Sequence, residues 1–349
     1  MKILSKLFQS CLLIFLMLFS SLFACTDFIL DYGSKNVVVG RSMEFGSNLE
    51  SQIVIFPKNE KRVSKIKNRN GLSWTSKYAY IAVTSFKTDL VADGMNEKGL
   101  SIGTLWFTDV KYPKIPTNAR SKTIALEDLS NWILGSFTNI SEVKKGLQKI
   151  YIWAHVFKAL KEIPPIHFAL HDQSGKSLVI EFVDGKMNLI DNEVGVLTNN
   201  PAFDWHVTNL SNYINLSAIN KGKVVFDGTA INPVGQGSGL LGLPGDWTPP
   251  SRFVKIAILK NFVKTPKRVE ENINLAFHLL NTVDIPYGVV RSKDGKEFDH
   301  TQWIVVKDLV NKKLSYRTYK DLNIHTIDLM EEISKLNSKK KIIPMVGAI

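Results

Sequence analysis

The sequence predicts an α+β fold, in which strands and helices are grouped rather than alternating. Between residues 26 and 85 short apolar runs alternate with turn signals, as in a strand-rich region. Two stretches with helical spacing follow each other between residues 252 and 280, and strand-like runs return after residue 304. Alternating strand and helix patterns would instead have indicated a parallel α/β sheet.

The first elements are short apolar runs bounded by turn residues. We expect strands at residues 28–30, 37–39, 53–56 and 78–83. The spacing of apolar residues over 123–137 and 142–150 predicts two helices. Residues 167–172 and 178–183 are joined by Gln173-Ser174-Gly175-Lys176 and predict a β-hairpin.

The second half repeats this grouping. Residues 252–263 and 268–280 predict two helices, separated by Lys264-Thr265-Pro266. Residues 304–306 and 314–319 predict strands. No break in composition indicates a domain boundary. We therefore expect one large domain over residues 25–334 and a basic C-terminal tail over residues 335–349.

Composition places the chain among ordinary folded proteins. Its 349 residues are 44% apolar and 22% charged, which argues against a disordered chain, a collagen-like repeat and a disulfide scaffold. The net charge of +12 includes basic clusters at 58–67 and 335–341. Such clusters can bind nucleic acid or anionic lipid, but neither carries interleaved aromatic side chains. We expect solvated surface and no nucleic-acid partner.

Residues 1–24 have the layout of a secretory signal peptide. Lys2 and Lys6 precede an unbroken apolar run over 12–19, and small residues end at Ala24. The run is too short for a membrane span, and no later stretch approaches the required length. We therefore expect an exported protein, periplasmic in location, that is not inserted in a membrane after processing.

Cleavage after Ala24 would make Cys25 the first residue and the only remaining cysteine. A lone thiol in an exported protein has no partner for an internal disulfide. One interpretation is a lipobox, Leu22-Phe23-Ala24-Cys25, in a lipidated protein that binds a ligand without catalysis. The other is an N-terminal nucleophile, whose thiol attacks an amide while its own α-amine accepts the proton. These residues alone slightly favour the lipoprotein.

Neither a metal nor a nucleotide cofactor is expected. The seven histidines are scattered without the spacing of a zinc site. Residues 237–242 spell GxGxxG, but Pro244-Gly245 prevents the helix that a dinucleotide site requires. We expect a glycine-rich loop of the active site there instead.

Five blocks, in order along the chain, together point to one family. They are Cys25-Thr26-Asp27-Phe28 with Gly40-Arg41-Ser42-Met43-Glu44, residues 92–100 (ADGMNEKGL), residues 195–201 (GVLTNNP) leading into 203–206 (FDWH), residues 235–239 (GQGSG), and residues 242–253 (GLPGDWTPPSRF). The chain resembles the choloylglycine hydrolase / penicillin V acylase family of N-terminal nucleophile hydrolases from Cys25 to about Tyr319. The resemblance implies a four-layer αββα sandwich and overturns the preference for a lipoprotein.

The resemblance also implies roles for single residues. Cys25 would be the nucleophile and Arg41 the cation beside its thiol, which favours the thiolate. The side-chain amide of Asn199 would help to bind the tetrahedral oxyanion. Arg252 would complete the charge pattern of the site.

Two positions depart from the family pattern. Glu44 stands where the family has an aspartate that contacts the terminal amine, so its longer side chain must be accommodated. Trp106 stands where bile salt hydrolases have asparagine and penicillin V acylases often have tyrosine. In the family the backbone N–H at this position belongs to the oxyanion hole and the side chain shapes the acyl pocket, so the resemblance implies that Trp106 bears on specificity.

The resemblance implies a cofactor-free amidase that cleaves a linear C–N bond of a small N-acyl substrate. We expect an acylase of the penicillin V or N-acyl homoserine lactone type, with conjugated bile salts as the alternative substrates. The family often forms homotetramers, so the resemblance allows a homotetramer, although nothing in these residues establishes a subunit contact.

Overall fold

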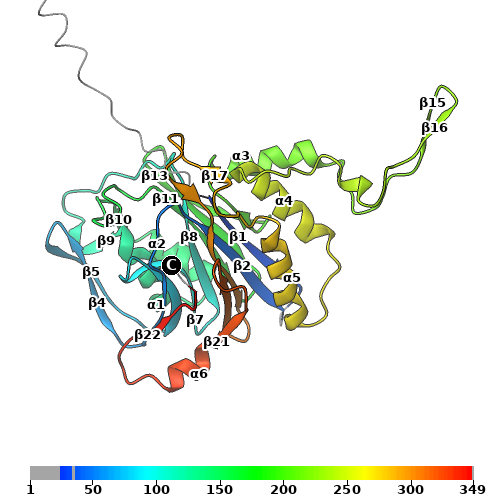
Figure 1. Ribbon diagram of the computed structural model, residues 1–349. Helices are drawn as coiled ribbons and strands as arrows, with labels where there is room; N and C mark the ends of the chain where they lie inside the picture. The colour runs from blue at the N-terminus through cyan, green and yellow to red at the C-terminus, as the bar shows by residue number, and fades with distance from the viewer. Residues whose placement is uncertain (1–23, 34–35, 348–349) are drawn as a thin grey trace, which may run out of the picture.

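The structure is a computed structural model that describes residues 24–33 and 36–347 (Figure 1). Apart from Ala24, the predicted signal peptide lies outside the described residues. Within the described part of the chain, no helix is both long enough and apolar enough to cross a membrane.

Two antiparallel sheets form the centre of the molecule. Neighbouring strands of the smaller sheet follow the order β14 (Val196–Leu197), β1 (Ala24–Asp31), β2 (Val37–Glu44), β19 (Thr301–Asp308), β20 (Lys313–Thr318) and β21 (His325–Asp328). The larger sheet follows the order β13 (Lys186–Asp191), β12 (Ser177–Val183), β11 (Ile166–Asp172), β8 (Leu100–Trp106), β7 (Leu90–Asn96), β6 (Tyr80–Ser85), β3 (Gln52–Phe56) and β22 (Lys341–Pro344).

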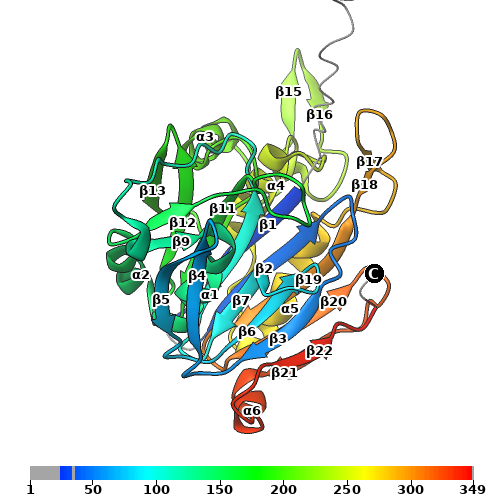
Figure 2. The same cartoon turned by 90° about the vertical axis from the view of Figure 1, so that its left-hand side faces the viewer.

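Helices cover the outer face of each sheet. On the smaller sheet, α4 (Pro249–Phe262) packs on β1 and α5 (Val269–Asn281) packs on β2 and β19. On the larger sheet, α1 (Leu129–Ser136) packs on β7 and β8, and α2 (Ile140–Leu147) packs on β11. The inner faces of the sheets meet where β1 contacts β8. Figures 1 and 2 show these layers, which confirm the α+β class and the αββα sandwich.

The chain also forms shorter elements between these strands and helices. They are β4 (Lys61–Ile66), β5 (Arg69–Thr75), β9 (Thr123–Ala125), β10 (Tyr151–Trp153), α3 (Phe203–Asn209), β15 (Val224–Phe226), β16 (Thr229–Ile231), β17 (Val290–Arg291), β18 (Phe298–Asp299) and α6 (Leu329–Ser334). The predicted hairpin at 167–183 is present as β11 and β12, and the two late helices are present as α4 and α5.

The predicted helix at 123–137 is wrong in its first part. Thr123–Ala125 is strand β9, which pairs in parallel with β10, and the α-helix begins only at Leu129. All three residues of β9 are buried, so their apolar and β-branched side chains satisfy a strand as well as a helix. Pairing with β10, a segment distant in the sequence, made these residues a strand and not a helix.

The predicted boundary after residue 334 also differs from the structure. Lys341–Pro344 forms β22 and pairs antiparallel with β3, with Ile343 opposite Ile53. The strand covers what would otherwise be an open edge of the larger sheet. The basic lysines of this segment had suggested a tail, but its isoleucines favour a strand.

A long arm leaves the body of the molecule between α3 and α4. Its tip is the β15–β16 hairpin, in which every residue of both strands is exposed (Figure 1). The glycine-rich segment 237–242 lies at the base of this arm, with a short 3-10 turn at Ser238–Leu240. None of these residues lines the two cavities near Cys25, so the structure gives no support to the expectation that they belong to the active site.

Candidate active site

Cys25 lies near the start of β1 with its side chain between the two sheets. In the antiparallel pairing of β1 with β2, Cys25 is opposite Met43, and its Sγ lies 3.7 Å from Met43 Sδ. Arg41, two residues earlier on β2, extends from the same face, because side chains alternate along a strand. Its Nη2 is 3.6 Å from Cys25 Sγ. The predicted nucleophile and cation are therefore in contact.

Arg41 is fully buried and remains a cation. Its Nη2 also donates a hydrogen bond to the carbonyl of Thr104 on β8. Burial alone would lower the pKa of Arg41, but the charges of Cys25, Asp27 and other nearby acids raise it above its ordinary value. The guanidinium is thus a fixed positive charge beside the sulfur.

Arg252 approaches the same strand from the opposite side. Pro249 and Pro250 begin α4, where a missing backbone N–H costs nothing, and Arg252 follows in the first turn. Its Nη1 donates to the carbonyl of Cys25 and, at 2.8 Å, to Thr26 Oγ1. Arg252 therefore holds the backbone of the nucleophile.

Asn199 lies between Arg252 and Trp106. Its Oδ1 accepts the backbone N–H of Cys25 at 2.8 Å and Arg252 Nη2 at 2.7 Å. Its Nδ2 donates to the carbonyl of Trp106 at 2.8 Å. The cis bond between Asn200 and Pro201 follows directly. The amide predicted to bind an oxyanion is thus fixed at both ends.

A buried histidine supports the Asn199 backbone. His206 Nε2 lies 3.0 Å from the Asn199 carbonyl. Burial lowers the pKa of His206 to about 4, so the ring is neutral at neutral pH and its Nε2 carries the donated proton. The FDWH block therefore acts on the site through a hydrogen bond to the backbone.

Glu44 is buried on the helix-facing side of β2, where Thr301 Oγ1 donates to its Oε1 at 2.8 Å. Burial raises the pKa of Glu44 to about 7. Among the described residues no hydrogen bond joins Glu44 to the nitrogen of Cys25, which is here a peptide nitrogen bonded to Ala24. Ala24 is the residue paired with Glu44 across the strands.

A second carboxylate lies near Glu44. Asp299, at the end of β18, is 4% exposed, and its pKa is raised to about 7 by burial and by the negative charge of Glu44. Sequence reasoning missed Asp299, because nothing in its local sequence distinguishes it from a turn residue.

Trp106 lines two cavities near the nucleophile. A narrow apolar pocket of about 70 Å³ is lined by Cys25, Trp106 and the side chains of Phe45, Phe86 and Leu160. A larger cavity of about 790 Å³ is lined by Ala24, Trp106 and Asn199. Phe45 and Trp106 meet edge to face, with ring centroids 6.0 Å apart. The structure therefore places Trp106 in the lining of both cavities.

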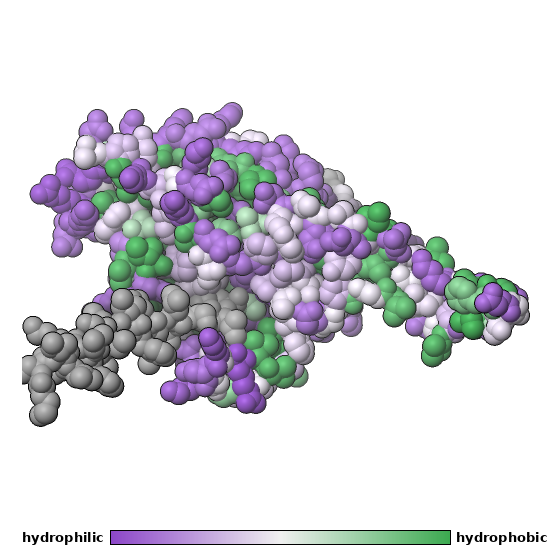
Figure 3. Space-filling view, turned by 90° about the horizontal axis from the view of Figure 1, so that it is seen from above, coloured by the Kyte–Doolittle hydropathy of each residue, from purple (hydrophilic) through white to green (hydrophobic). Residues whose placement is uncertain are grey.

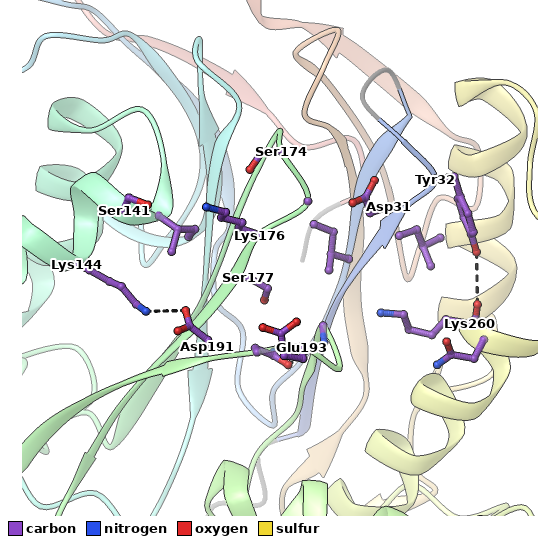
Figure 4. A pocket seen from close by; sticks show the side chains of 17 residues that line it. Asp31, Tyr32, Ser141, Lys144, Ser174, Lys176, Ser177, Asp191, Glu193 and Lys260 are labelled. Atoms are coloured by element: carbon purple, nitrogen blue, oxygen red, sulfur yellow. Dashed lines mark hydrogen bonds and ion pairs between the residues drawn. The ribbon is translucent and has the colours of Figure 1, made fainter.

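A third cavity, of about 670 Å³, is more polar and lies at the other end of β1 (Figure 4). Figure 4 shows Lys144 paired with Asp191, at 2.6 Å, and Lys260 extending from α4. Asp31 and Tyr32, six and seven residues beyond Cys25, line it. None of the predicted site residues does, so the chemistry suggested by Cys25 belongs to the cavities at Trp106.

Asp27 received no role from the sequence, yet it lies close behind the nucleophile. It is fully buried, and its Oδ1 is 2.6 Å from His171 Nε2. Burial would raise the pKa of Asp27, but His171, Lys307 and Arg41 hold it below its ordinary value. Its position two residues after Cys25 in a strand was a usable signal, since both side chains must share a face.

Comparison with known proteins agrees with this geometry. The model of the family described as linear amide C–N hydrolases, choloylglycine hydrolase family, matches residues 25–343. The bile salt hydrolase/transferase of Clostridium perfringens is 35% identical over 88% of this chain and 93% of its own. The penicillin V acylase of Pectobacterium atrosepticum is 27% identical over 88% of this chain and 81% of its own.

A solved structure extends the similarity to the fold. A variant of the conjugated bile acid hydrolase from Clostridium perfringens superposes with a TM-score of 0.80 and 31% identity, covering 92% of this chain and 97% of that chain. The matched region begins at Cys25, the residue around which Arg41, Asn199 and Arg252 converge. The chain therefore belongs to the choloylglycine hydrolase family and is an enzyme that hydrolyses linear amide C–N bonds.

Proposed function

We propose that the protein is an exported acylase that hydrolyses N-acyl amides of the penicillin V or N-acyl homoserine lactone type, with Cys25 as its N-terminal nucleophile. The narrow apolar pocket at the Cys25 sulfur carries this proposal. At about 70 Å³ it is far below the roughly 300–1,000 Å³ typical of sites for drug-sized ligands. Such a pocket suits a slender acyl or aryloxyacetyl group, and the larger cavity suits the amine portion.

The proposed reaction follows from the contacts around Cys25. Removal of residues 1–24 frees the α-amine, which accepts the thiol proton, while Arg41 favours the thiolate. The sulfur attacks the amide carbonyl, and the oxyanion is bound by the Asn199 amide and the Trp106 backbone N–H. The C–N bond breaks, the amine leaves with the proton, and water then hydrolyses the thioester to release the acid.

Conjugated bile salts are the second candidate substrates. The observation in their favour is the 35% identity to a bile salt hydrolase/transferase, higher than the 27% identity to a penicillin V acylase. Amine release from penicillin V, from N-acyl homoserine lactones of graded chain length, and from taurocholate and glycocholate decides between them. A kcat/KM highest for a bile salt would overturn the first proposal, and no release from any substrate would overturn both.

Export and maturation are proposed from the layout of residues 1–24. Intact mass and N-terminal sequencing of the protein from the producing cells test them. A chain beginning at unmodified Cys25 supports the nucleophile. A diacylglyceryl group on the Cys25 sulfur would block the nucleophilic thiol and would mean a ligand-binding lipoprotein.

The arm supports assembly into a homo-oligomer, for which we propose the tetramer. An isolated two-stranded hairpin is at best marginally stable in water, and this one exposes large apolar side chains along its length. Figure 3 shows apolar residues at the end of the arm. Those with an exposed fraction of half or more are Ile214, Ile219, Val224, Val225, Phe226, Val234 and Leu241. Light scattering on the full chain and on a Phe226→Ser variant should show the tetramer only for the former.

A further inference from the structure

Five ionisable side chains lie together between the two sheets, behind the nucleophile. This interlayer charge cluster consists of Asp27, Arg41, Asp93, His171 and Lys307, none more than 1% exposed. The smaller sheet supplies Asp27, Arg41 and Lys307, and the larger sheet supplies the other two. Lys307 Nζ forms an ion pair with Asp93 Oδ1, and His171 pairs with Asp27.

Arg41 connects this cluster to the Cys25 sulfur. Its Nη2 contacts Thr104 O and Cys25 Sγ, but its Nε and Nη1 have no hydrogen-bond partner among the described residues. Asp27 Oδ2 and Asp93 Oδ2 are likewise without a hydrogen-bond partner there. Three groups of negative or developing negative charge, Asp27, Asp93 and the Cys25 sulfur, therefore compete for one guanidinium.

Lys307 and Arg41 are the lysine and the arginine of the cluster, and they face its two carboxylates, Asp27 and Asp93. Lys307 and Arg41 are the two cations whose charges act on Asp93, and burial of that carboxylate without a partner would be costly. Burial raises the pKa of Asp93, so if Lys307 is lost, an ionised Asp93 depends on Arg41, the other cation that lowers this pKa. The unpartnered Nε and Nη1 allow the guanidinium to turn toward Asp93, and the turn takes Nη2 away from the sulfur.

We propose that Lys307 is a positioning residue for the thiol. By neutralising Asp93, it leaves the Arg41 guanidinium beside Cys25 Sγ, where the fixed cation favours the thiolate. This inference deepens the proposed function. The catalytic importance of Lys307 rests on that function, whereas its effect on the reactivity of the Cys25 thiol does not.

The test measures the rate of Cys25 alkylation by iodoacetamide from pH 5 to 10 on the full exported chain. Alkylation requires neither a substrate nor a free α-amine, so its outcome is independent of which amide the enzyme cleaves. Lys307→Met keeps an unbranched side chain one atom shorter and removes the charge. We expect the midpoint pH of alkylation to rise by about one, so that the rate at a pH well below the parent midpoint falls about tenfold.

A second substitution separates positioning from general damage. Lys307→Met combined with Asp93→Asn removes both charges, and we expect the midpoint pH to return to that of the parent. Arg62→Met on β4 is the matched control: it breaks a partly buried ion pair with Glu60, outside the interlayer charge cluster, and should leave the midpoint unchanged.

Two results would overturn the proposal. One is a midpoint pH in Lys307→Met equal to that of the parent, and the other is a midpoint pH in the double variant equal to that of Lys307→Met. If Lys307→Met does not fold, Asp93→Asn alone decides. With the competing carboxylate gone, alkylation at pH 7 must be at least as fast as in the parent, and a slower rate contradicts the positioning role.

Discussion

Arg252 Nη2 and the backbone N–H of Cys25 both donate to Asn199 Oδ1, at 2.7 and 2.8 Å. With the amide oxygen held by two donors, the amide nitrogen must face the other way, toward Trp106, where it donates to a carbonyl at 2.8 Å. Arg252 therefore decides which end of the Asn199 amide is presented to a substrate. A donor fixed in advance is what oxyanion stabilisation requires.

The first prediction is that Arg252→Leu loses activity through Asn199. We expect kcat to fall at least about 100-fold, the size of effect seen when an oxyanion donor is lost. Steady-state kinetics on the best substrate of the panel measure it. Lys260→Leu, on the same helix but bonded to the Val194 carbonyl at the polar cavity, should leave kcat unchanged. Equal kcat in Arg252→Leu and the parent would refute the role.

The second prediction concerns Glu44, whose pKa is raised to about 7 by burial. An unfolded glutamate titrates near 4.3, so between these values the folded chain binds more protons than the unfolded one. The free energy of unfolding must therefore fall as pH rises from about 4.3 to 7. In protein that retains Ala24, Glu44→Gln removes this loss.

The expected gain for Glu44→Gln is on the order of 3 kcal/mol at pH 8, and it vanishes below about pH 4.3. Urea denaturation of parent and variant across this pH range measures it. Asp299→Asn should act in the same direction, because its pKa is also raised to about 7. A variant that is less stable than the parent at pH 8 would show that Glu44 is ionised in a favourable contact.

Much of this fold was predictable from local patterns. Period-two runs and turn residues predicted the hairpin of β11 and β12, and helical spacing predicted α4 and α5. The predictions failed where pairing with a segment distant in the sequence determined the secondary structure. Thr123–Ala125 became a strand only because Tyr151–Trp153 lies beside it, and Lys341–Pro344 only because β3 offered an open edge.

The site divides in the same way. Motif blocks pointed to Cys25, Arg41 and Asn199, which the structure brings together. Asp93 lay in a quoted block but received no role, and Lys307 carried no local signal at all. The importance of Asp93 and Lys307 comes from their contact between the two sheets. The two residues are 214 positions apart, so spacing along the chain could not predict this contact.

The third prediction is that Trp106 limits the acyl group. Trp106 lines both cavities beside Cys25, so Trp106→Ala should join them into one larger space. We expect the kcat/KM for taurocholate to rise relative to that for penicillin V, together with a stability loss of about 3–5 kcal/mol from the missing buried ring. Trp132→Ala on α1, another buried tryptophan, should lose stability without changing that ratio. An unchanged ratio in Trp106→Ala would mean that the indole does not set specificity.

The last prediction concerns Gly103 on β8, which gives the Asp27 carboxylate its space. A Cβ at Gly103 would lie 2.7 Å from Asp27 Oδ2, a contact too short to keep. Gly103→Ala must therefore displace the carboxylate from His171, to which it is bonded at 2.6 Å, and we expect a loss of about 2 kcal/mol or more. Gly222→Ala in the arm, where nothing lies within 4 Å, should be neutral.

A double-mutant cycle identifies the cause of the Gly103 effect. If the contact with Asp27 is responsible, combining Gly103→Ala with Asp27→Ala should cost less than the sum of the two single losses, because the carboxylate that clashes is gone. Urea denaturation of the four proteins supplies the interaction free energy. Strict additivity would instead place the strain in the β8 backbone, and Asp27 would then not be the group that requires glycine at this position.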